Sequence, residues 1–185
     1  DMEKYSIWIR IGDAFFNLDD KESAINCYEN CLTIAPWLPD GYLSLARAYF
    51  VLNKIQHSKE FALDGLRKAA TGKHTYEMIA WNPREYDLIG MDLLAKCYFK
   101  MSSLDKASEI YELLSKRFPL NKEVKERTEE LKMMKNELKQ VDNYLDEIIA
   151  LKVKNKETIK PILDKAPKNL RAHPKLLILQ NEYFK

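Results

Sequence analysis

The chain has 185 residues, enough for one domain or one elongated array of repeats. Apolar residues make up 46% of it and glycine occupies only 5 positions, which favours an all-helical protein with a continuous core. Its 30 basic and 28 acidic residues give a formal charge of +2, so no strong electric field favours nucleic acid or a membrane as partner.

A 34-residue spacing recurs through the first 121 residues. When Ala24 is aligned with Ala107, small residues, aromatic residues and prolines coincide. The coinciding pairs are Trp8/Met91, Gly12/Ala95, Phe15/Tyr98, Tyr28/Tyr111 and Pro36/Pro119. A third frame starting at Pro39 places Tyr42, Leu45, Ala46 and Tyr49 at the same early positions. This pattern is typical of helix–turn–helix repeats that bury their apolar faces by stacking on one another.

The repeat register predicts six helices in three pairs, which occupy residues 5–38, 39–70 and 88–121. The helices are Tyr5 to Asn17, Lys21 to Ile34, Asp40 to Leu52, Ile55 to Ala70, Leu88 to Met101 and Leu104 to Phe118. Turns are expected at Asp19-Asp20 and Ser102-Ser103, and a proline ends the first and third pairs because proline cannot extend a helix.

An insertion of about 15 residues separates the second pair from the third, at 71–87. It carries the candidate contact residues His74, Tyr76, Trp81 and Tyr86, and an Asn82-Pro83 turn signal. Either the aromatic side chains fold back over the repeat interface, or they form a contact loop for a partner or ligand, since insertions in repeat proteins often emerge on the binding face.

A long charged helix is predicted after Asn121, a plausible N-cap. Two interleaved apolar series run along it: Val124, Leu131, Leu138 and Leu145, then Met134, Val141 and Ile148. They indicate either a helix that packs on the third pair as the next repeat's first helix, or the seam of a homodimeric coiled coil through residues 124–148. Asp142-Asn143 leaves open whether residues 122–152 form one helix or two.

Two short helices are predicted to close the segment 122–185, at Pro161–Ala166 and Pro174–Phe184, because proline is favoured at the first helical position. Residues 152–185 hold nine basic and three acidic side chains, which indicates either a solvated basic tail or an anion-binding surface. The last helix has an apolar face suited to capping the stack or docking another domain. The chain starts directly before its first helix, which suggests a segment of a longer polypeptide.

No catalytic, cofactor-binding or metal-binding constellation is found. The three histidines are scattered, the glycines stand singly, and no further ligand completes a metal set around Cys27 and Cys31. With Cys97, these cysteines are predicted to be buried reduced thiols, which favours a reducing, cytoplasmic location. No apolar run approaches the length of a membrane span.

The surface most suited to function is a groove lined by the first helix of each pair. Phe16, Phe50 and Phe99 each follow the packing aromatic residue, and successive helical residues point about 100° apart, so these three are expected to form a separate stripe. Asp13, Arg47 and Lys96 flank it three residues earlier. Such a stripe suits an extended peptide or a docked helix, or it packs against the chain's own insertion.

These residues resemble the tetratricopeptide repeat family over residues 5–121, through Trp8, Gly12, Phe15, Ala24, Tyr28 and Pro36, and again through Ala95, Tyr98, Ala107, Tyr111 and Pro119. The resemblance implies an all-α, right-handed superhelical stack of antiparallel helix pairs, with a role in protein interaction or domain spacing. Some members hold peptide carboxylates in a basic groove. Here the corresponding positions are Ile9, Asp13, Leu43 and Asp92, which speaks against that activity.

Residues 74–112 also resemble the helical repeat segment attached to family 2 glycosyltransferases of bacteria and phages, in which an aromatic, Asn/Asp-Pro-containing insertion precedes a repeat like LLAKCYF. This resemblance implies a non-catalytic scaffold or docking module of a multidomain glycosyltransferase. The alternative is a free-standing adaptor that binds a peptide or helix in its groove. Whether the whole protein is an enzyme, and which partner it binds, stay open.

Overall fold

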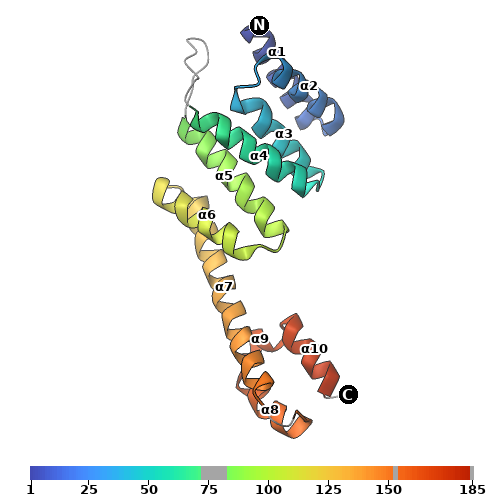
Figure 1. Cartoon of the computed structure of the whole chain (residues 1–185), viewed down its shortest axis with the longest axis vertical. Helices are drawn as coiled ribbons and strands as arrows, with labels where there is room; N and C mark the ends of the chain where they lie inside the picture. Colours follow the sequence, from blue (N-terminus) through green and yellow to red (C-terminus); the bar gives the residue numbers. More distant parts are fainter. Residues whose placement is uncertain (72–82, 152–153, 184–185) are drawn as a thin grey trace. The chain divides into compact units, whose positions relative to one another are not determined.

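The computed structural model describes residues 1–71, 83–151 and 154–183, and every regular element within them is a helix (Figure 1). They divide into two compact units, Asp1–Thr128 (unit 1) and Glu129–Lys185 (unit 2). The division falls inside a long helix, whereas the sequence placed the boundary before it, at residue 121.

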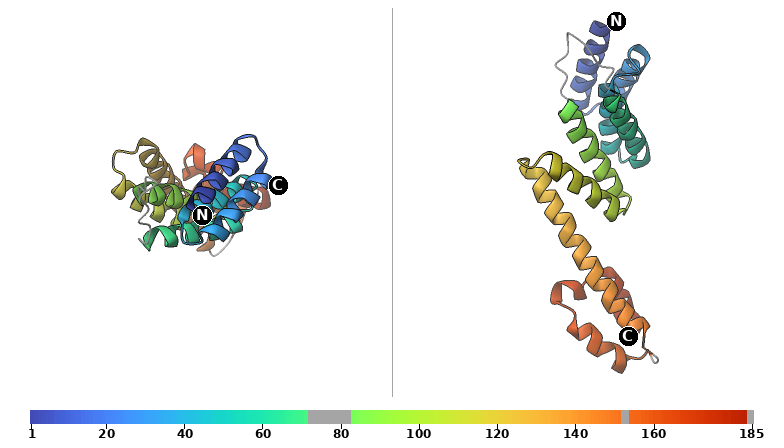
Figure 2. Two further views of the ribbon diagram at one scale, coloured as in Figure 1. Left: turned by 90° about the horizontal axis from the view of Figure 1, so that it is seen from above. Right: turned by 60° about the vertical axis from the view of Figure 1, so that its left-hand side comes forward.

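Unit 1 contains three helix pairs that follow one another along the chain (Figures 1 and 2). The pairs are α1 (Met2–Asn17) with α2 (Lys21–Ile34), α3 (Pro39–Val51) with α4 (Ile55–Ala70), and α5 (Pro83–Lys100) with α6 (Leu104–Arg117). The predicted all-α fold of stacked helix pairs is confirmed. The bounds of α2 and α4 agree with the prediction to the residue.

The turns inside the three pairs share one backbone geometry. Asp19, Asn53 and Ser102 have φ of 68°, 57° and 59°, in the left-handed region that few non-glycine residues adopt. In each turn the amide of this residue bonds to the carbonyl three residues back, at 3.0–3.2 Å, and the next amide bonds five residues back. The 34-residue register of the sequence is therefore a repeat of backbone hydrogen bonds as well.

Small residues lie where the two helices of a pair cross, as the sequence predicted. Ala24, Ser58 and Ala107, at equivalent positions of the three second helices, are fully or almost fully buried. Gly12 is the tightest case, since a Cβ there would lie 2.5 Å from Cε1 of Tyr28. The aromatic ring thus occupies the space that a side chain on α1 would need.

Helix α5 begins at Pro83, five residues before the predicted start at Leu88. The Asn-Pro signal in this segment is a helix start, because proline lacks only an N–H that would be unsatisfied at the first helical position anyway. The predicted insertion at 71–87 is therefore helical from residue 83 onward.

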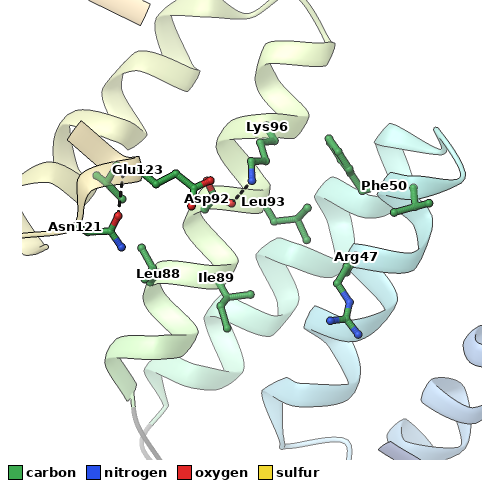
Figure 3. Close-up of a pocket in the computed structure, with 11 residues that line it drawn as sticks. Arg47, Phe50, Leu88, Ile89, Asp92, Leu93, Lys96, Asn121 and Glu123 are labelled. Atoms are coloured by element: carbon green, nitrogen blue, oxygen red, sulfur yellow. Dashed lines mark hydrogen bonds and ion pairs between the residues drawn. The ribbon is translucent and has the colours of Figure 1, made fainter. Parts of the chain in front are cut away.

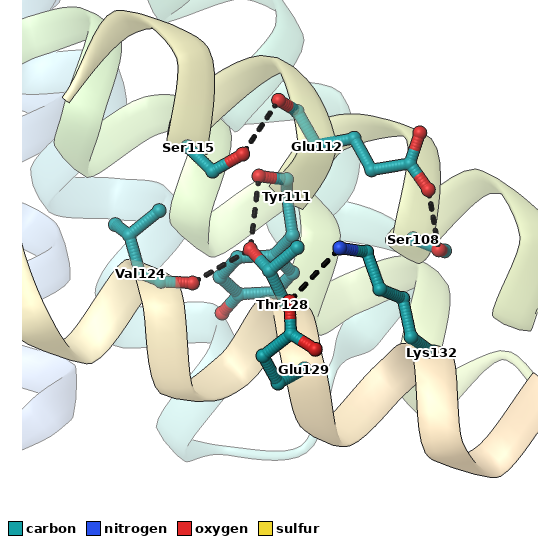
Figure 4. A network of polar contacts seen from close by, with 8 residues as sticks. All are labelled: Ser108, Tyr111, Glu112, Ser115, Val124, Thr128, Glu129 and Lys132. Carbon is teal, nitrogen blue, oxygen red and sulfur yellow. Dashed lines mark hydrogen bonds and ion pairs between the residues drawn. The ribbon is translucent and has the colours of Figure 1, made fainter. Parts of the chain in front are cut away.

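Helix α7 (Lys122–Ile149) is one continuous helix of 28 residues. The sequence had left open whether residues 122–152 form one helix or two. Its predicted N-cap is confirmed, because Oδ1 of Asn121 accepts a hydrogen bond from the amide of Val124 at 3.0 Å. In unit 1, Thr128 is buried, with its hydroxyl 3.2 Å from the carbonyl oxygen of Tyr111 and 2.7 Å from that of Val124 (Figure 4). These contacts fix the first turns of α7 beside α6.

Unit 2 has its own small core, formed by the second half of α7 with α8 (Lys156–Lys165), α9 (Lys168–Arg171) and α10 (Pro174–Tyr183). Its buried members include Val141, Ile148, Ile159, Leu163, Leu170 and Leu176. The predicted packing of the seam on the third pair holds at its start, where Val124 is buried and Thr128 contacts Tyr111. Val141 and Ile148 pack on α8–α10 instead, which leaves the predicted coiled-coil dimer without support.

The start of α8 also differs from the prediction. The helix begins at Lys156 and contains Pro161, which the sequence placed at its first position. Asn155 and Thr158 form a capping box, with the Asn155 side chain accepting from the Thr158 amide at 2.9 Å and Thr158 Oγ1 accepting from the Asn155 amide at 3.1 Å. This reciprocal cap starts the helix earlier than the proline signal. Helix α10 begins at Pro174 as predicted.

No helix in the part of the chain that the structure describes is both long and apolar enough to cross a membrane.

Candidate docking groove

A groove of about 380 Å³ lies in unit 1 between α3, α5 and the start of α7, and is called the α3–α5 groove here (Figure 3). It is lined by Arg47, Phe50, Val51, Leu88, Ile89, Asp92, Leu93, Lys96, Asn121, Glu123 and Val124. Apolar side chains make up most of this lining. Val51 and Ile89 are 55% and 52% exposed, so the groove presents large hydrophobic groups to solvent.

Arg47, at one end of the groove, is held by partners from the first helix pair. Its guanidinium lies 2.7 Å from the Asp13 carboxylate and 3.3 Å from the Tyr28 hydroxyl, and the same hydroxyl donates to Asp13 at 2.8 Å. The guanidinium also stacks over Phe16, 4.3 Å from the ring centroid. The positive charge of Arg47 is therefore compensated before any ligand arrives.

Lys96 on α5 is compensated in the same way, one repeat further along. Its ammonium lies 2.6 Å from the Asp92 carboxylate one helical turn earlier, and Asp92 also accepts a hydrogen bond of 2.6 Å from the Tyr111 hydroxyl. Each cation of the groove thus shares an aspartate with a buried tyrosine. Of the charged residues that line the groove, two are basic and two are acidic, so it carries no excess of either sign.

The two tyrosines have altered acidity as a result. Burial raises the pKa of Tyr28 above its ordinary range, and the hydrogen bond to Asp13 raises it further. Burial and the bond to Asp92 do the same for the pKa of Tyr111. Both phenols therefore stay protonated as donors, which keeps the two aspartates turned toward the tyrosines and the neighbouring cations.

Most residues of the predicted stripe lie in or beside the groove. Phe50, Arg47 and Lys96 line it directly, and Asp13 and Phe16 adjoin it through Arg47. Phe99 is the exception, because it is 46% exposed and does not contribute to the lining. Five of the six predicted groove residues are thus brought together, while their role in binding stays a prediction.

Of the four predicted contact-loop residues, His74, Tyr76 and Trp81 lie outside the described residues. Tyr86 is on α5, half-buried, and its hydroxyl donates to the Asp40 carboxylate at the start of α3. Asp40 also accepts a hydrogen bond from Tyr5 at 3.4 Å. Tyr86 therefore folds back onto the repeat array, which is one of the two alternatives that the sequence left open.

Sequence reasoning missed the apolar wall of the groove, which Leu88, Ile89 and Leu93 provide, and the contribution of Val124 from α7. Leu88 and Ile89 follow the predicted insertion, and Val124 was assigned to the helical seam instead. A signal was present, since Ile89 stands at the repeat position of Asp40, where an apolar residue on an exposed helix face is unexpected.

The three cysteines are buried free thiols, as predicted. Burial raises the pKa of Cys31 to about 12 and also raises that of Cys97, whose sulfur lies 3.2 Å from the Ser58 hydroxyl. Such thiols are poor nucleophiles. Within residues 1–71, 83–151 and 154–183, no group of three or more histidine, cysteine or acidic side chains is placed to hold a metal ion.

Comparison with known proteins agrees with this architecture. Residues 5–36, which cover α1 and α2, match the family model described as tetratricopeptide repeat. No curated protein sequence matches the chain significantly. The family match covers a single helix pair, so the evidence for the remaining pairs is structural.

Several solved structures share the fold. The first tetratricopeptide repeat domain of Spaghetti (RPAP3), bound to the HSP90 peptide SRMEEVD, aligns with a TM-score of 0.60 and 18% identity over 72% of this chain and 97% of that one. The N-terminal domain of stress-induced protein 1 from C. elegans gives 0.58 and 17% over 70% and 95%. The Sgt2 tetratricopeptide repeat domain from Aspergillus fumigatus gives 0.59 and 20% over 74% and 82%. At these identities the likeness concerns the fold alone.

Proposed function

We propose that unit 1 is a non-catalytic docking module that binds a helix or peptide of a protein partner in the α3–α5 groove. The observation that carries this proposal is the groove itself, an open apolar depression with exposed Val51 and Ile89 on opposite helices. Exposed hydrophobic side chains that converge on one concave surface are typical of peptide-recognition sites.

The size of the groove limits what it can hold. Pockets for small molecules span roughly 300–1,000 Å³ and enclose most of their ligand. A volume of about 380 Å³ that stays open along one side suits one or two large side chains of a longer ligand. A helix that presents leucine or phenylalanine residues one turn apart fills it, and places its own polar face toward solvent.

The charges of the groove favour an apolar anchor over an acidic one. The RPAP3 domain in the comparison is bound to a peptide, SRMEEVD, with three acidic residues and one basic residue. In this chain Arg47 and Lys96 are each paired with an aspartate, at 2.7 Å and 2.6 Å. An incoming carboxylate would have to displace those aspartates, and would meet Glu123 at the edge of the groove.

A peptide library displayed on phage tests the proposal directly. Peptides selected on the 185-residue chain are expected to carry large apolar residues one helical turn apart, and to bind Ile89→Asp at least about tenfold more weakly, which is about 1.4 kcal/mol. Phe50→Ala is expected to weaken the same peptides without changing helicity. The matched control is Leu113→Asp, because Leu113 is 50% exposed on α6 and does not line the groove.

Two results would contradict the proposal: selected peptides that bind Ile89→Asp as tightly as the unaltered chain, or a preference for acidic peptides such as SRMEEVD. The first would place the binding surface elsewhere. The second would mean that a ligand carboxylate displaces Asp13 and Asp92 from Arg47 and Lys96.

The setting of this module is a separate question. The resemblance of residues 74–112 to glycosyltransferase-attached repeats supports a module that positions catalytic domains, but neither the family match nor the similar structures named above supports it. A free-standing adaptor uses the same groove. The native reading frame distinguishes the two, because only the former encodes a nucleotide-sugar-binding domain beside these helices.

A further inference from the structure

The charges that line the α3–α5 groove are unequally compensated. Arg47 is paired with Asp13 at 2.7 Å, although Asp13 does not line the groove. Lys96 is paired with Asp92 at 2.6 Å. The remaining charged residue of the lining is Glu123, in the first turn of α7, and in the part of the chain that the structure describes no side chain forms an ion pair or hydrogen bond with its carboxylate. Counted with their partners, the charges of the groove therefore leave one negative charge uncompensated.

The repeat register places Glu123 one helix further along than the apolar wall of the groove. Glu123 is equivalent to Ile89 on α5, which lines the same groove, and to Asp40 on α3. The Asp40 carboxylate accepts hydrogen bonds from the hydroxyls of Tyr86 and Tyr5. Glu123 has no such donors, so both of its carboxylate oxygens remain available to a ligand beside an apolar surface.

Glu123 also lies on the side of the groove that already holds a carboxylate. Its side chain extends from α7 toward Asp92 on α5 (Figure 3). Both carboxylates act on the Tyr111 hydroxyl, because burial raises its pKa most, Asp92 raises it next and Glu123 adds a smaller increase. Arg127, one turn further along α7, opposes this effect. Since Lys96 is bound to Asp92, a further cation from a ligand would relieve the repulsion between the two carboxylates.

We propose that the ligand of the α3–α5 groove is an amphipathic helix with a lysine or arginine beside its apolar anchors, and that Glu123 selects for this basic residue. The inference rests on the proposed function, since it concerns the ligand of the same groove. A long basic side chain reaches a carboxylate at the edge of the groove while its methylene stem covers apolar surface. Because Glu123 is exposed, the ion pair adds specificity and only a modest gain in affinity.

Selection from the phage-displayed peptide library tests this inference when it is run in parallel on the unaltered chain and on Glu123→Gln. Peptides from the unaltered chain are expected to carry lysine or arginine within one helical turn of their apolar anchors, and peptides from Glu123→Gln to lack this enrichment. Glu126→Gln is the matched control, because Glu126 stands on the same helix, is paired with Lys122 at 3.5 Å and does not line the groove. This control is expected to select basic residues as the unaltered chain does.

Calorimetry of one selected peptide and its lysine-to-glutamine counterpart separates the ion pair from the favourable effect of Glu123 on the N-terminus of α7, which is the same for both peptides. The lysine peptide is expected to bind the unaltered chain about threefold more tightly, and to lose this advantage in Glu123→Gln and in high salt. Selected peptides without basic residues, equal binding of the two peptides, or a lysine preference that persists in Glu123→Gln would each overturn the inference. If the selected peptides are still weakened by Ile89→Asp, the proposed function stands without it. If no selected peptide depends on Ile89, both proposals fall.

Discussion

Gly12 offers a sharp test of how the first helix pair is packed. Replacing it with valine would place a Cβ 2.5 Å from Cε1 and 2.8 Å from Cδ1 of Tyr28, well inside the 3.5–4.0 Å at which carbon atoms attract. Tyr28 is fully buried, so its ring must move by about 1 Å against close-packed neighbours.

Two effects add to the loss of stability and one opposes it. Overpacking of this kind costs about 1–3 kcal/mol. Displacement of the ring also breaks the 2.8 Å bond from the Tyr28 hydroxyl to Asp13, worth about 1 kcal/mol. Valine has a better helix propensity than glycine, which returns about 0.4 kcal/mol. The expected net loss in the free energy of unfolding is therefore about 2–4 kcal/mol.

Urea unfolding followed by tryptophan fluorescence measures this loss in unit 1, because Trp8, Trp37 and Trp81 all belong to residues 1–128. Arg10→Val is the control, since Arg10 is exposed on the same helix. If the clash is with Tyr28, the penalty of Gly12→Val shrinks by more than about 1 kcal/mol in a Tyr28→Ala background. A penalty no larger than that of Arg10→Val, or one that is unchanged without the ring, would refute the reasoning.

Two further predictions concern the polar contacts beside the groove. Burial raises the folded-state pKa of Tyr28 and Tyr111, so the folded state holds protons that the unfolded state releases above pH 10. The free energy of unfolding is therefore expected to fall by about 1.4 kcal/mol per pH unit per tyrosine as the pH rises above 10. Tyr28→Phe is expected to flatten this dependence in denaturant titrations at high pH, and an unchanged slope would show that the phenol ionises freely. Asp92→Asn removes the negative charge 2.6 Å from the Lys96 ammonium and is expected to raise the affinity for the acidic peptide SRMEEVD, measured by calorimetry in low salt. Equal affinity in both chains would show that Asp92 does not compete with ligand carboxylates.

The repeat register explains why several of the candidate groove residues lie on one surface of unit 1. A residue's place in the 34-residue register fixes the direction of its side chain on the first helix of a pair, so the register alone assigns Arg47, Phe50 and Lys96 to one surface. Phe99 follows the same register but lies outside the groove, so the register does not by itself decide which side chains line it.

The sequence by itself determined the helices of unit 1, because their small, aromatic and proline residues recur in a register that only stacked helix pairs can bury. Local signals also fixed the N-cap at Asn121 and the start of α10 at Pro174. Only the tertiary structure decided what covers the apolar residues of α7, since Val141 and Ile148 pack on helices that lie later in the chain. The pairing of Arg47 with Asp13, 34 residues away, likewise depends on how neighbouring helices are placed in space. The repeat register predicts which face of a helix is apolar, whereas the helix that packs on that face is decided only when the chain folds.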